Sequence, residues 1–297
     1  MPRDLGGKRT QAHPAISSVA VSRTGVGREV NQDTVRVANP DRYPVESCGR
    51  LFCLADGMGG YAAGDEASAM AAKTLIASFY SRAKARPEVA MRAAMEAANE
   101  TVYATALERH ASMGTTLIGL HLEGPLITIG HVGDSRVLRL RRGEIACLTR
   151  DHTPVGDLAH MKLLTDEQVR QHDGRSVLNR CLGIAAFVRP DIVSTRAEAG
   201  DMYILCSDGF WSALRMDEIR LAAALAIEHA RATGDPPEVW VERLGQDLVR
   251  LARDQGSEDD RSVVVIWVRT LPPARRAAGR WPGRLLGWLG RLIRHAG

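Results

Sequence analysis

Short apolar runs, separated by turns or by longer helical stretches, dominate the hydrophobic pattern of this chain. Runs of this length that contain branched residues predict β-strands. Arg142 and Gly143 separate two of the runs, which indicates a hairpin. The predicted strands cover residues 16–22, 34–38, 51–55, 115–122, 126–132, 137–140, 145–148, 202–206 and 262–268.

Longer segments repeat apolar residues at the spacing of an α-helix. Residues 62–111 are rich in alanine and are divided by Pro87. We therefore expect two antiparallel helices there, with Pro87 in the first turn of the second helix. A second predicted helix pair and one short helix cover residues 217–232, 237–253 and 166–172.

The order of these elements predicts the fold class. Strands connected by short turns and helices in consecutive pairs are typical of α+β proteins, not of alternating βαβ units. Because each helix pair must bury its apolar stripe on a sheet, we predict a four-layer α-β-β-α sandwich of two antiparallel sheets flanked by helix pairs. One domain would cover residues 15–269, with an irregular segment at about 151–183. A flexible N-terminus at 1–14 and a tail at 270–297 would flank it.

Charge is unevenly distributed along the 297 residues. The formal net charge is +4, but six arginines and no acidic residue follow Leu271, which leaves the rest of the chain at −2. A mildly acidic body argues against a nucleic-acid-binding domain. Apolar residues make up 45% of the chain, which is sufficient for a large core and excludes a wholly disordered protein.

Cysteine usage and the N-terminal residues bear on the compartment. The chain has five cysteines, with no CxxC or zinc-type spacing, which favours free thiols in a reducing compartment. The first residues lack the apolar core of a signal peptide, and no stretch reaches the roughly 18 apolar residues of a spanning helix. We therefore expect a cytoplasmic protein. We also expect it to be a monomer.

The tail has an amphipathic pattern of its own. On a helical wheel of residues 280–294, tryptophan and leucine side chains fall on one arc of roughly 160°, opposite the arginines. This sorting predicts a helix at the inner face of the membrane, and docking on a partner or on the chain's own domain is the alternative. The apolar arc comprises Trp281, Leu285, Leu286, Trp288, Leu289, Leu292 and Ile293, and the arginines are Arg280, Arg284, Arg291 and Arg294.

Acidic residues, several of them beside glycine, recur at the ends of the apolar runs. Carboxylates brought together repel one another, which raises their pKa values or requires a cation. A glycine lets the backbone carbonyl beside it turn toward a bound ion. Carboxylate and carbonyl oxygens suit Mg²⁺ or Mn²⁺ rather than Zn²⁺. One Asp-Gly pair is typical of an ordinary turn, whereas several at strand ends indicate a metal centre. The candidates are Asp56-Gly57, Asp134, Asp208-Gly209 and Glu258-Asp259-Asp260.

Seven short motifs occur in one order along the chain. They are Arg28-Glu-Val-Asn31-Gln-Asp33, Ala55-Asp56-Gly57-Met-Gly-Gly60, Met113-Gly114-Thr-Thr116, Val132-Gly-Asp134-Ser-Arg136, Leu148-Thr-Arg-Asp151-His152, Ser207-Asp208-Gly209 and Asp259-Asp-Arg-Ser-Val263. Over about residues 15–269, the chain resembles bacterial metal-dependent serine/threonine protein phosphatases of type 2C, the PPM family. The resemblance implies that family's α-β-β-α sandwich, with metal ions in a cleft at one sheet edge.

The resemblance also implies a set of metal ligands. Asp56 would bridge two metal ions, and the Gly57 carbonyl would bind the second of them. Asp208 and Asp259 would bind the first. Asp134, together with Asp208, would hold a looser third ion, so two to three Mn²⁺ or Mg²⁺ are expected.

Two further matched residues would act on water and substrate. Asp33 would act through metal-bound water, and Arg28 would bind the substrate phosphate with its planar fork. Two metal ions about 3.5–4 Å apart lower the pKa of a bridging water. The implied reaction is in-line attack of the bridging hydroxide on phosphoserine or phosphothreonine. The implied partners are phosphorylated proteins and a bacterial Ser/Thr kinase whose action the enzyme would oppose.

Two of the departures from the family pattern bear on the predicted catalytic site. Met58 stands where animal members have a histidine proposed as general acid, which leaves the proton donor open. Asp260 stands where asparagine is usual, either as an outward-facing neighbour of Asp259 or as an alternative ligand. The alternative function is a pseudophosphatase or phosphoprotein-binding scaffold recruited through the tail. Loss of the matched acids or of Arg28 would indicate that role, and all of them are present.

Overall fold

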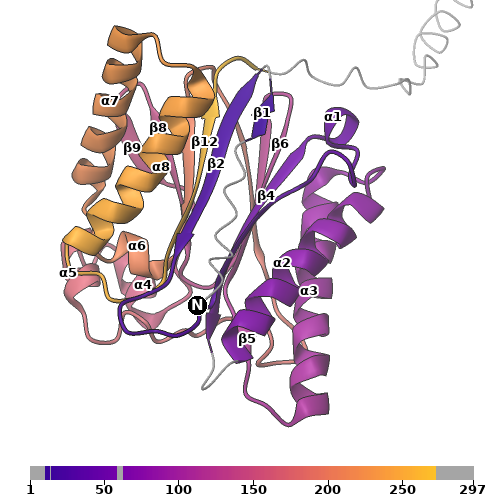
Figure 1. The fold of residues 1–297 in the computed structure, drawn as a ribbon. Helices are drawn as coiled ribbons and strands as arrows, with labels where there is room; N and C mark the ends of the chain where they lie inside the picture. Colours follow the sequence, from indigo (N-terminus) through magenta and orange to yellow (C-terminus); the bar gives the residue numbers. More distant parts are fainter. Residues whose placement is uncertain (1–10, 14, 59–62, 272–297) are drawn as a thin grey trace, which may run out of the picture.

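Two antiparallel β-sheets lie face to face, and a pair of long helices covers the outer face of each sheet (Figure 1). The computed structural model describes residues 11–13, 15–58 and 63–271. The prediction of an α+β, four-layer α-β-β-α sandwich is confirmed. In strand order, the first sheet contains β1 (Gln11–His13), β2 (Ile16–Arg23), β12 (Arg261–Val268), β11 (Met202–Cys206), β8 (Arg136–Arg141) and β9 (Glu144–Cys147).

The second sheet has its own strand order and packs against the first. It contains β10 (Asp191–Arg196), β7 (Leu126–Val132), β6 (Leu117–Glu123), β4 (Arg50–Met58) and β3 (Asp33–Val37), and β5 (Gly114–Thr115) also pairs with β4. The helices α2 (Ala63–Ser81) and α3 (Pro87–Arg109) cover this sheet, and α7 (Met216–Thr233) and α8 (Pro237–Asp254) cover the first. The short helices are α1 (Val45–Cys48), α4 (Pro154–His160), α5 (Asp166–Gln171) and α6 (Asp208–Trp211).

Strands from the two ends of the described chain pair along their whole length. In the antiparallel ladder of β2 and β12, Ile16 lies opposite Val268, and Arg23 lies opposite Arg261. The loop that follows β2 is therefore beside the loop that precedes β12. This pairing brings two segments more than 200 residues apart in sequence to one edge of the sandwich.

Three apolar layers hold the four structural layers together. Along β11, Met202, Ile204 and Cys206 pack toward α7 and α8, whereas Tyr203 and Leu205 pack between the sheets. Successive side chains of a strand point to opposite faces, so a strand covered on both faces is apolar throughout. This explains why the central strands appear in the sequence as continuous apolar runs.

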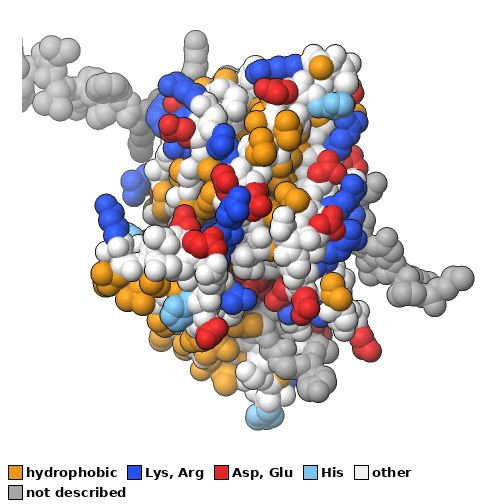
Figure 2. Space-filling view, turned by 90° about the vertical axis from the view of Figure 1, so that its left-hand side faces the viewer, with side chains coloured by type: hydrophobic (Ala, Val, Ile, Leu, Met, Phe, Trp, Pro, Cys, Tyr) orange, Lys and Arg blue, Asp and Glu red, His pale blue; other side chains and the backbone are white. Residues whose placement is uncertain are grey.

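The outer surface formed by α7 and α8 is mixed in character. Charged side chains of both signs surround scattered apolar side chains on this face (Figure 2). Leu221 and Leu225 on α7 are both more than half exposed. Single apolar side chains among charges are ordinary on a protein surface.

The predicted long helices and all the predicted strands are present, with ends that shift by a few residues and with 115–122 divided between β5 and β6. The hairpin at Arg142-Gly143 is also confirmed, with both residues at positive φ as a tight hairpin turn requires. The strand β10 was not predicted, because it is a partly exposed edge strand in which four of the six residues are polar and do not alternate with the apolar ones. Gln11–His13 pairs with β2, so this part of the expected flexible N-terminus is a strand.

The predicted amphipathic helix at 280–294 lies outside the described residues, as does most of the predicted flexible N-terminus. Membrane-surface binding by the tail stays a prediction. Within the described part of the chain, no helix has both the length and the hydropathy needed to cross a membrane.

Candidate metal centre

The predicted acidic residues come together at one edge of the two sheets. From the second sheet, Asp33 begins β3 and Asp56 lies near the end of β4. From the first sheet, Asp208 begins α6 directly after β11, and Asp259 lies just before β12. Asp134 lies in the connection between β7 and β8, which joins the two sheets. The charges of the other four aspartates all act on Asp56.

Asp33 and Asp56 lie directly opposite each other on neighbouring strands. Two like charges in this position destabilise a sheet. Asp33 is only 8% exposed, and within the described residues neither of its carboxylate oxygens forms a hydrogen bond of good geometry. Burial raises the pKa of Asp33 to about 7, although the nearby hydroxyls of Ser262 and Ser207 oppose the shift. This carboxyl group therefore holds a proton or needs a positive charge nearby.

Three more carboxyl groups of the cluster are in the same condition. Burial, followed by the charges of neighbouring aspartates, raises the pKa of Asp56 and Asp134 well above the ordinary value. The pKa of Asp208 is also raised, mainly by burial and by the charge of Asp259. In the described structure, no lysine or arginine forms an ion pair with any of these three carboxylates. Within the described residues, the charge of these three carboxylates would therefore be unbalanced if they were ionised.

The donor set fits hard divalent cations. Clustered carboxylate oxygens suit Mg²⁺ or Mn²⁺, and Mg²⁺ is commonly bound through one or two carboxylates with several waters completing its shell. Within residues 11–13, 15–58 and 63–271, no group of three or more His, Cys, Asp or Glu side chains is arranged so that it could hold a metal ion by itself. A cation at this cluster would therefore have few side-chain ligands, with waters completing its shell.

Gly57, beside Asp56, lies where no larger residue fits. It is buried, and a Cβ atom built on it would lie 2.0 Å from the Gly64 carbonyl oxygen and 2.7 Å from that of Gln32. Its backbone N–H donates to the Gln32 carbonyl at 3.1 Å. Close packing against the start of α2 therefore requires glycine here, which is compatible with the predicted role of its carbonyl as a ligand.

A stack of buried side chains supports Asp134 from behind. The Trp211 indole Nε1–H donates to the Asp134 backbone carbonyl at 2.9 Å. The Arg136 guanidinium lies 3.6 Å from the centre of a Trp211 ring, a cation–π contact. Arg136 also donates to both carboxylate oxygens of Asp151, with Nη2 to Oδ2 at 2.7 Å. The stack ties Asp134 to the start of the 151–183 segment.

Asp151→Asn is expected to destabilise the protein by about 3–5 kcal/mol, because it leaves the buried Arg136 charge without its partner. Both side chains are less than 10% exposed. Urea unfolding followed by circular dichroism measures the change. The matched control is Asp247→Asn, whose partner Arg250 is exposed, and it should cost less than about 1 kcal/mol. Equal small effects of both variants would contradict the structural role of the buried pair.

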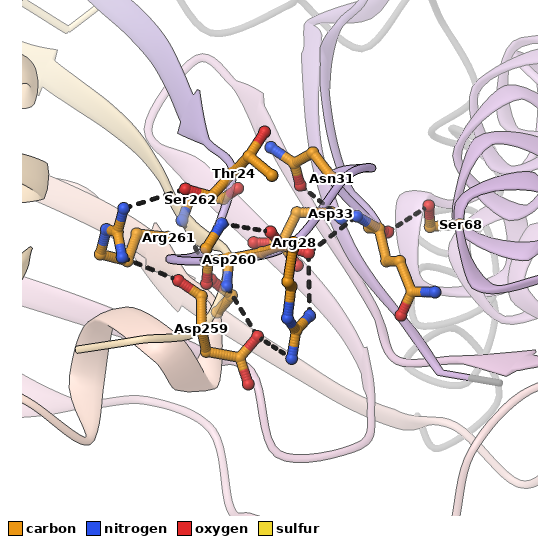
Figure 3. A network of polar contacts seen from close by, with 12 residues as sticks. Thr24, Arg28, Asn31, Asp33, Ser68, Asp259, Asp260, Arg261 and Ser262 are labelled. Carbon is orange, nitrogen blue, oxygen red and sulfur yellow. Dashed lines mark hydrogen bonds and ion pairs between the residues drawn. The ribbon is translucent and has the colours of Figure 1, made fainter. Parts of the chain in front are cut away.

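Arg28 lies at the edge of the acidic cluster, on the loop that follows β2 (Figure 3). Its Nη2 lies 2.6 Å from Asp259 Oδ1, and its Nη1 lies 3.0 Å from Asp260 Oδ2. The Arg28 side chain is 40% exposed, so its guanidinium reaches both the acids and the solvent. Burial lowers its pKa, but the charges of Asp259 and Asp260 outweigh that effect and the net pKa is raised.

Asp260 does not face outward, so that reading of the sequence was wrong. Its side chain is 2% exposed, whereas that of Asp259 is 40% exposed. Asp260 accepts backbone N–H bonds from Gly25 at 2.7 Å and from Gln32 at 2.8 Å. These bonds use its oxygens for the protein's own backbone, which favours Asp259 over Asp260 as the cation ligand.

Sequence reasoning gave no role to Trp211, Arg136 or Asp151, although the last two lie in quoted motifs. Their contacts join segments 15 to 75 residues apart, and no local pattern in the sequence predicts such pairing. The only signal in the sequence was a charged residue at each of these two positions, Arg136 beside an apolar run and Asp151 in a predicted turn. His152, the residue after Asp151, accepts the Gly133 N–H through Nδ1 at 3.0 Å.

Comparisons with known proteins agree with this geometry. A family model described as protein phosphatase 2C matches residues 26–239. The chain is 35% identical over 219 residues to the serine/threonine protein phosphatase PstP of Mycobacterium tuberculosis, an alignment that covers 70% of this chain and 42% of PstP. It is 31% identical over 247 residues to the protein phosphatase PhpP of Streptococcus pneumoniae, covering 82% of this chain and 93% of PhpP.

A solved structure is similar as well. The catalytic domain of the phosphatase PstP in complex with two manganese ions matches with a TM-score of 0.68 and 30% sequence identity. The match covers 86% of this chain and 99% of that structure. The chain therefore spans less than half of the full PstP sequence but nearly all of its solved catalytic domain.

Proposed function

This chain belongs to the protein phosphatase 2C family, and we propose that it is a metal-dependent phosphatase of phosphoserine and phosphothreonine in proteins. The observation that carries the proposal is the cluster of buried and partly buried aspartates with Arg28 at its edge. The cluster has the negative charge to hold cations, and the arginine has the charge to hold a phosphate. The relatives named above are described as protein phosphatases, which supports the same reaction.

The acidic residues would divide between holding cations and supporting them. Asp56, Asp208 and Asp259 and the Gly57 carbonyl would bind two Mn²⁺ or Mg²⁺, and Asp134 would contribute to a third site. When bound, such ions lower the pKa of water and neutralise phosphoryl oxygens. Asp33, opposite Asp56 and buried, would accept or hold a proton beside the site.

Arg28 would orient the phosphate group. A guanidinium has N–H donors in a planar fork that matches two phosphate oxygens. Nη1 lies on Asp260 and Nη2 on Asp259, so the partly exposed fork becomes available to a phosphate when Asp259 turns to a cation. Holding the phosphate in one orientation sets up in-line attack, which is the main task of a protein in phosphoryl transfer.

The function is tested by substitution of Arg28 with phosphoserine and phosphothreonine peptides as substrates. Arg28→Ala is expected to raise KM by about tenfold or more, since a charge-assisted pair is worth about 1.5–3 kcal/mol. Arg28→Lys is expected to recover only a small part of the loss, because a point charge cannot form the fork. Full recovery by lysine would contradict bidentate binding. Phosphopeptide binding without hydrolysis by the unsubstituted protein would favour the scaffold alternative.

The substrates of this reaction must come from protein phosphorylation. We propose that the partners are phosphorylated proteins and a Ser/Thr kinase that adds the phosphate this chain removes. We propose no nucleic-acid partner, because the body of the chain is mildly acidic.

A further inference from the structure

We propose that Asp260 is a positioning residue that holds Arg28 and its loop in the geometry that binds phosphate. The inference deepens the proposed function and rests on the role of Arg28 given there. It concerns the position where the family pattern has asparagine and this chain has aspartate. It assigns Asp260 to the loop and not to a cation.

The Asp260 carboxylate gathers three points of one loop. Its Oδ1 accepts the Gly25 N–H at 2.7 Å, where the loop begins. Its Oδ2 accepts the Gln32 N–H at 2.8 Å, where the loop ends. The same Oδ2 accepts Nη1 of Arg28, in the middle of the loop, at 3.0 Å. One buried side chain thus fixes both ends of the loop and the residue that it presents.

Further contacts hold the loop between Gly25 and Gln32 close to the segment that carries Asp260 (Figure 3). The Arg261 guanidinium donates to the Thr24 carbonyl at 3.0 Å, and the Val26 N–H donates to the Glu258 carbonyl at 2.8 Å. A Cβ atom on Gly25 would lie 2.5 Å from that same carbonyl oxygen. The two segments are therefore in direct backbone contact, and the carboxylate lies between them with almost no access to water.

The chemistry of this position requires a carboxylate rather than an amide. All three partners of Asp260 are N–H donors. An asparagine offers one acceptor oxygen, and its NH₂ group would face either Gly25 or both Gln32 and Arg28. Aspartate is therefore the residue that satisfies all three donors at once, and its charge strengthens each bond.

The ion pair between Arg28 and Asp259 explains why Arg28 also needs its contact with Asp260. Arg28 Nη2 also contacts Asp259, a predicted cation ligand that is far more exposed than Asp260. An Asp259 oxygen that faces a cation is not available to Arg28. Asp260 is then the contact that keeps the guanidinium in place while its other N–H groups turn to phosphate.

The test is a double-mutant cycle between positions 28 and 260, measured with a small phosphoester and Mn²⁺. Asp260→Asn is expected to raise KM and the inhibition constant of inorganic phosphate about five- to tenfold, with kcat changed by less than about twofold. In the Arg28→Ala background, Asp260→Asn should add little to KM, because the residue that it positions is gone. Unchanged or lowered KM in Asp260→Asn would overturn the proposal.

Asp260→Glu separates position from charge. Glutamate keeps the negative charge but moves the carboxylate by one methylene, so positioning predicts a raised KM. A KM equal to that of the unsubstituted enzyme would overturn the proposal. If Arg28→Ala raises KM while both Asp260 variants do not, the proposed function survives and this inference fails.

Asp201→Asn is the matched control. Asp201 is also buried, and it accepts bonds from an arginine, a backbone N–H and a hydroxyl, those of Arg141, Glu198 and Tyr203. It precedes β11, at the far end of that strand from Asp208. The Asp201→Asn substitution should lower the free energy of unfolding without raising KM. In metal-free protein, hydrogen exchange of the Gly25 and Gln32 amides should accelerate in Asp260→Asn and not in Asp201→Asn. Equal exchange in the two variants would contradict the positioning role of Asp260.

Discussion

Asp56→Ala is expected to lower kcat for phosphopeptide hydrolysis by about three orders of magnitude or more. Asp56 is the residue on which the charges of the other four aspartates converge. Its removal takes away the ligand predicted to be shared by two cations, and each tenfold loss corresponds to about 1.4 kcal/mol of barrier. Three orders of magnitude therefore mean about 4 kcal/mol, a reasonable share for a disrupted two-metal site.

The measurement combines kinetics with bound-metal analysis. Chelation of the unsubstituted protein should reproduce the loss, and Mn²⁺ or Mg²⁺ should restore activity to that protein but not to Asp56→Ala. Asp254→Ala is the control, because Asp254 is exposed at the end of α8 and pairs only with its neighbour Arg253. Wild-type turnover in Asp56→Ala, or activity that survives chelation, would exclude this cluster as the catalytic centre.

The metal-free protein is expected to lose stability as pH rises from about 4 to 7. The pKa of Asp33 is about 7 in the folded protein against an ordinary value of 3.8, so the folded state retains a proton that the unfolded chain releases. Stability from this group is fully present below the unfolded pKa and is lost as pH rises through the folded pKa. The shift corresponds to a few kcal/mol at most, and the raised pKa values of Asp56, Asp134 and Asp208 act in the same direction.

Urea unfolding between pH 4 and 8, with chelator and with Mn²⁺, tests this expectation. Added Mn²⁺ should reverse the trend, because a cation stabilises the ionised carboxylates of the folded state. Asp33→Asn should flatten the metal-free profile and make that variant more stable than the parent at pH 8. A metal-free profile that rises with pH would show that the cluster is balanced by some other charge.

The fold was predictable from the sequence because the outer helix pairs repeat apolar residues at helical spacing and the central strands appear as short continuous apolar runs. Met202–Cys206 is apolar at every position because both of its faces are covered. Asp191–Arg196 was missed because an edge strand with one half-exposed face is nearly as polar as a loop.

The candidate site was predictable only in part, for a similar reason. Residues at strand ends are placed by the sheet, so Asp56 and Asp208 could be expected to meet. The orientation of Asp259 and Asp260 depends on the turn before β12, where no period applies. Of the two alternatives left open for Asp260, the outward-facing one was wrong. The contact of Trp211 with Asp134 joins residues 77 positions apart and is set by the tertiary fold.

The distribution of the acids between the sheets has a mechanical consequence. Asp33 and Asp56 belong to one sheet, Asp208 and Asp259 to the ends of the other, and Asp134 to the chain that crosses between them. The distance between the two halves of the cluster is thus set by how the sheets are seated, through buried side chains such as Phe52 and Tyr203. A shear of one sheet over the other would therefore change the distances between the aspartates of the two sheets without any change in the residues themselves.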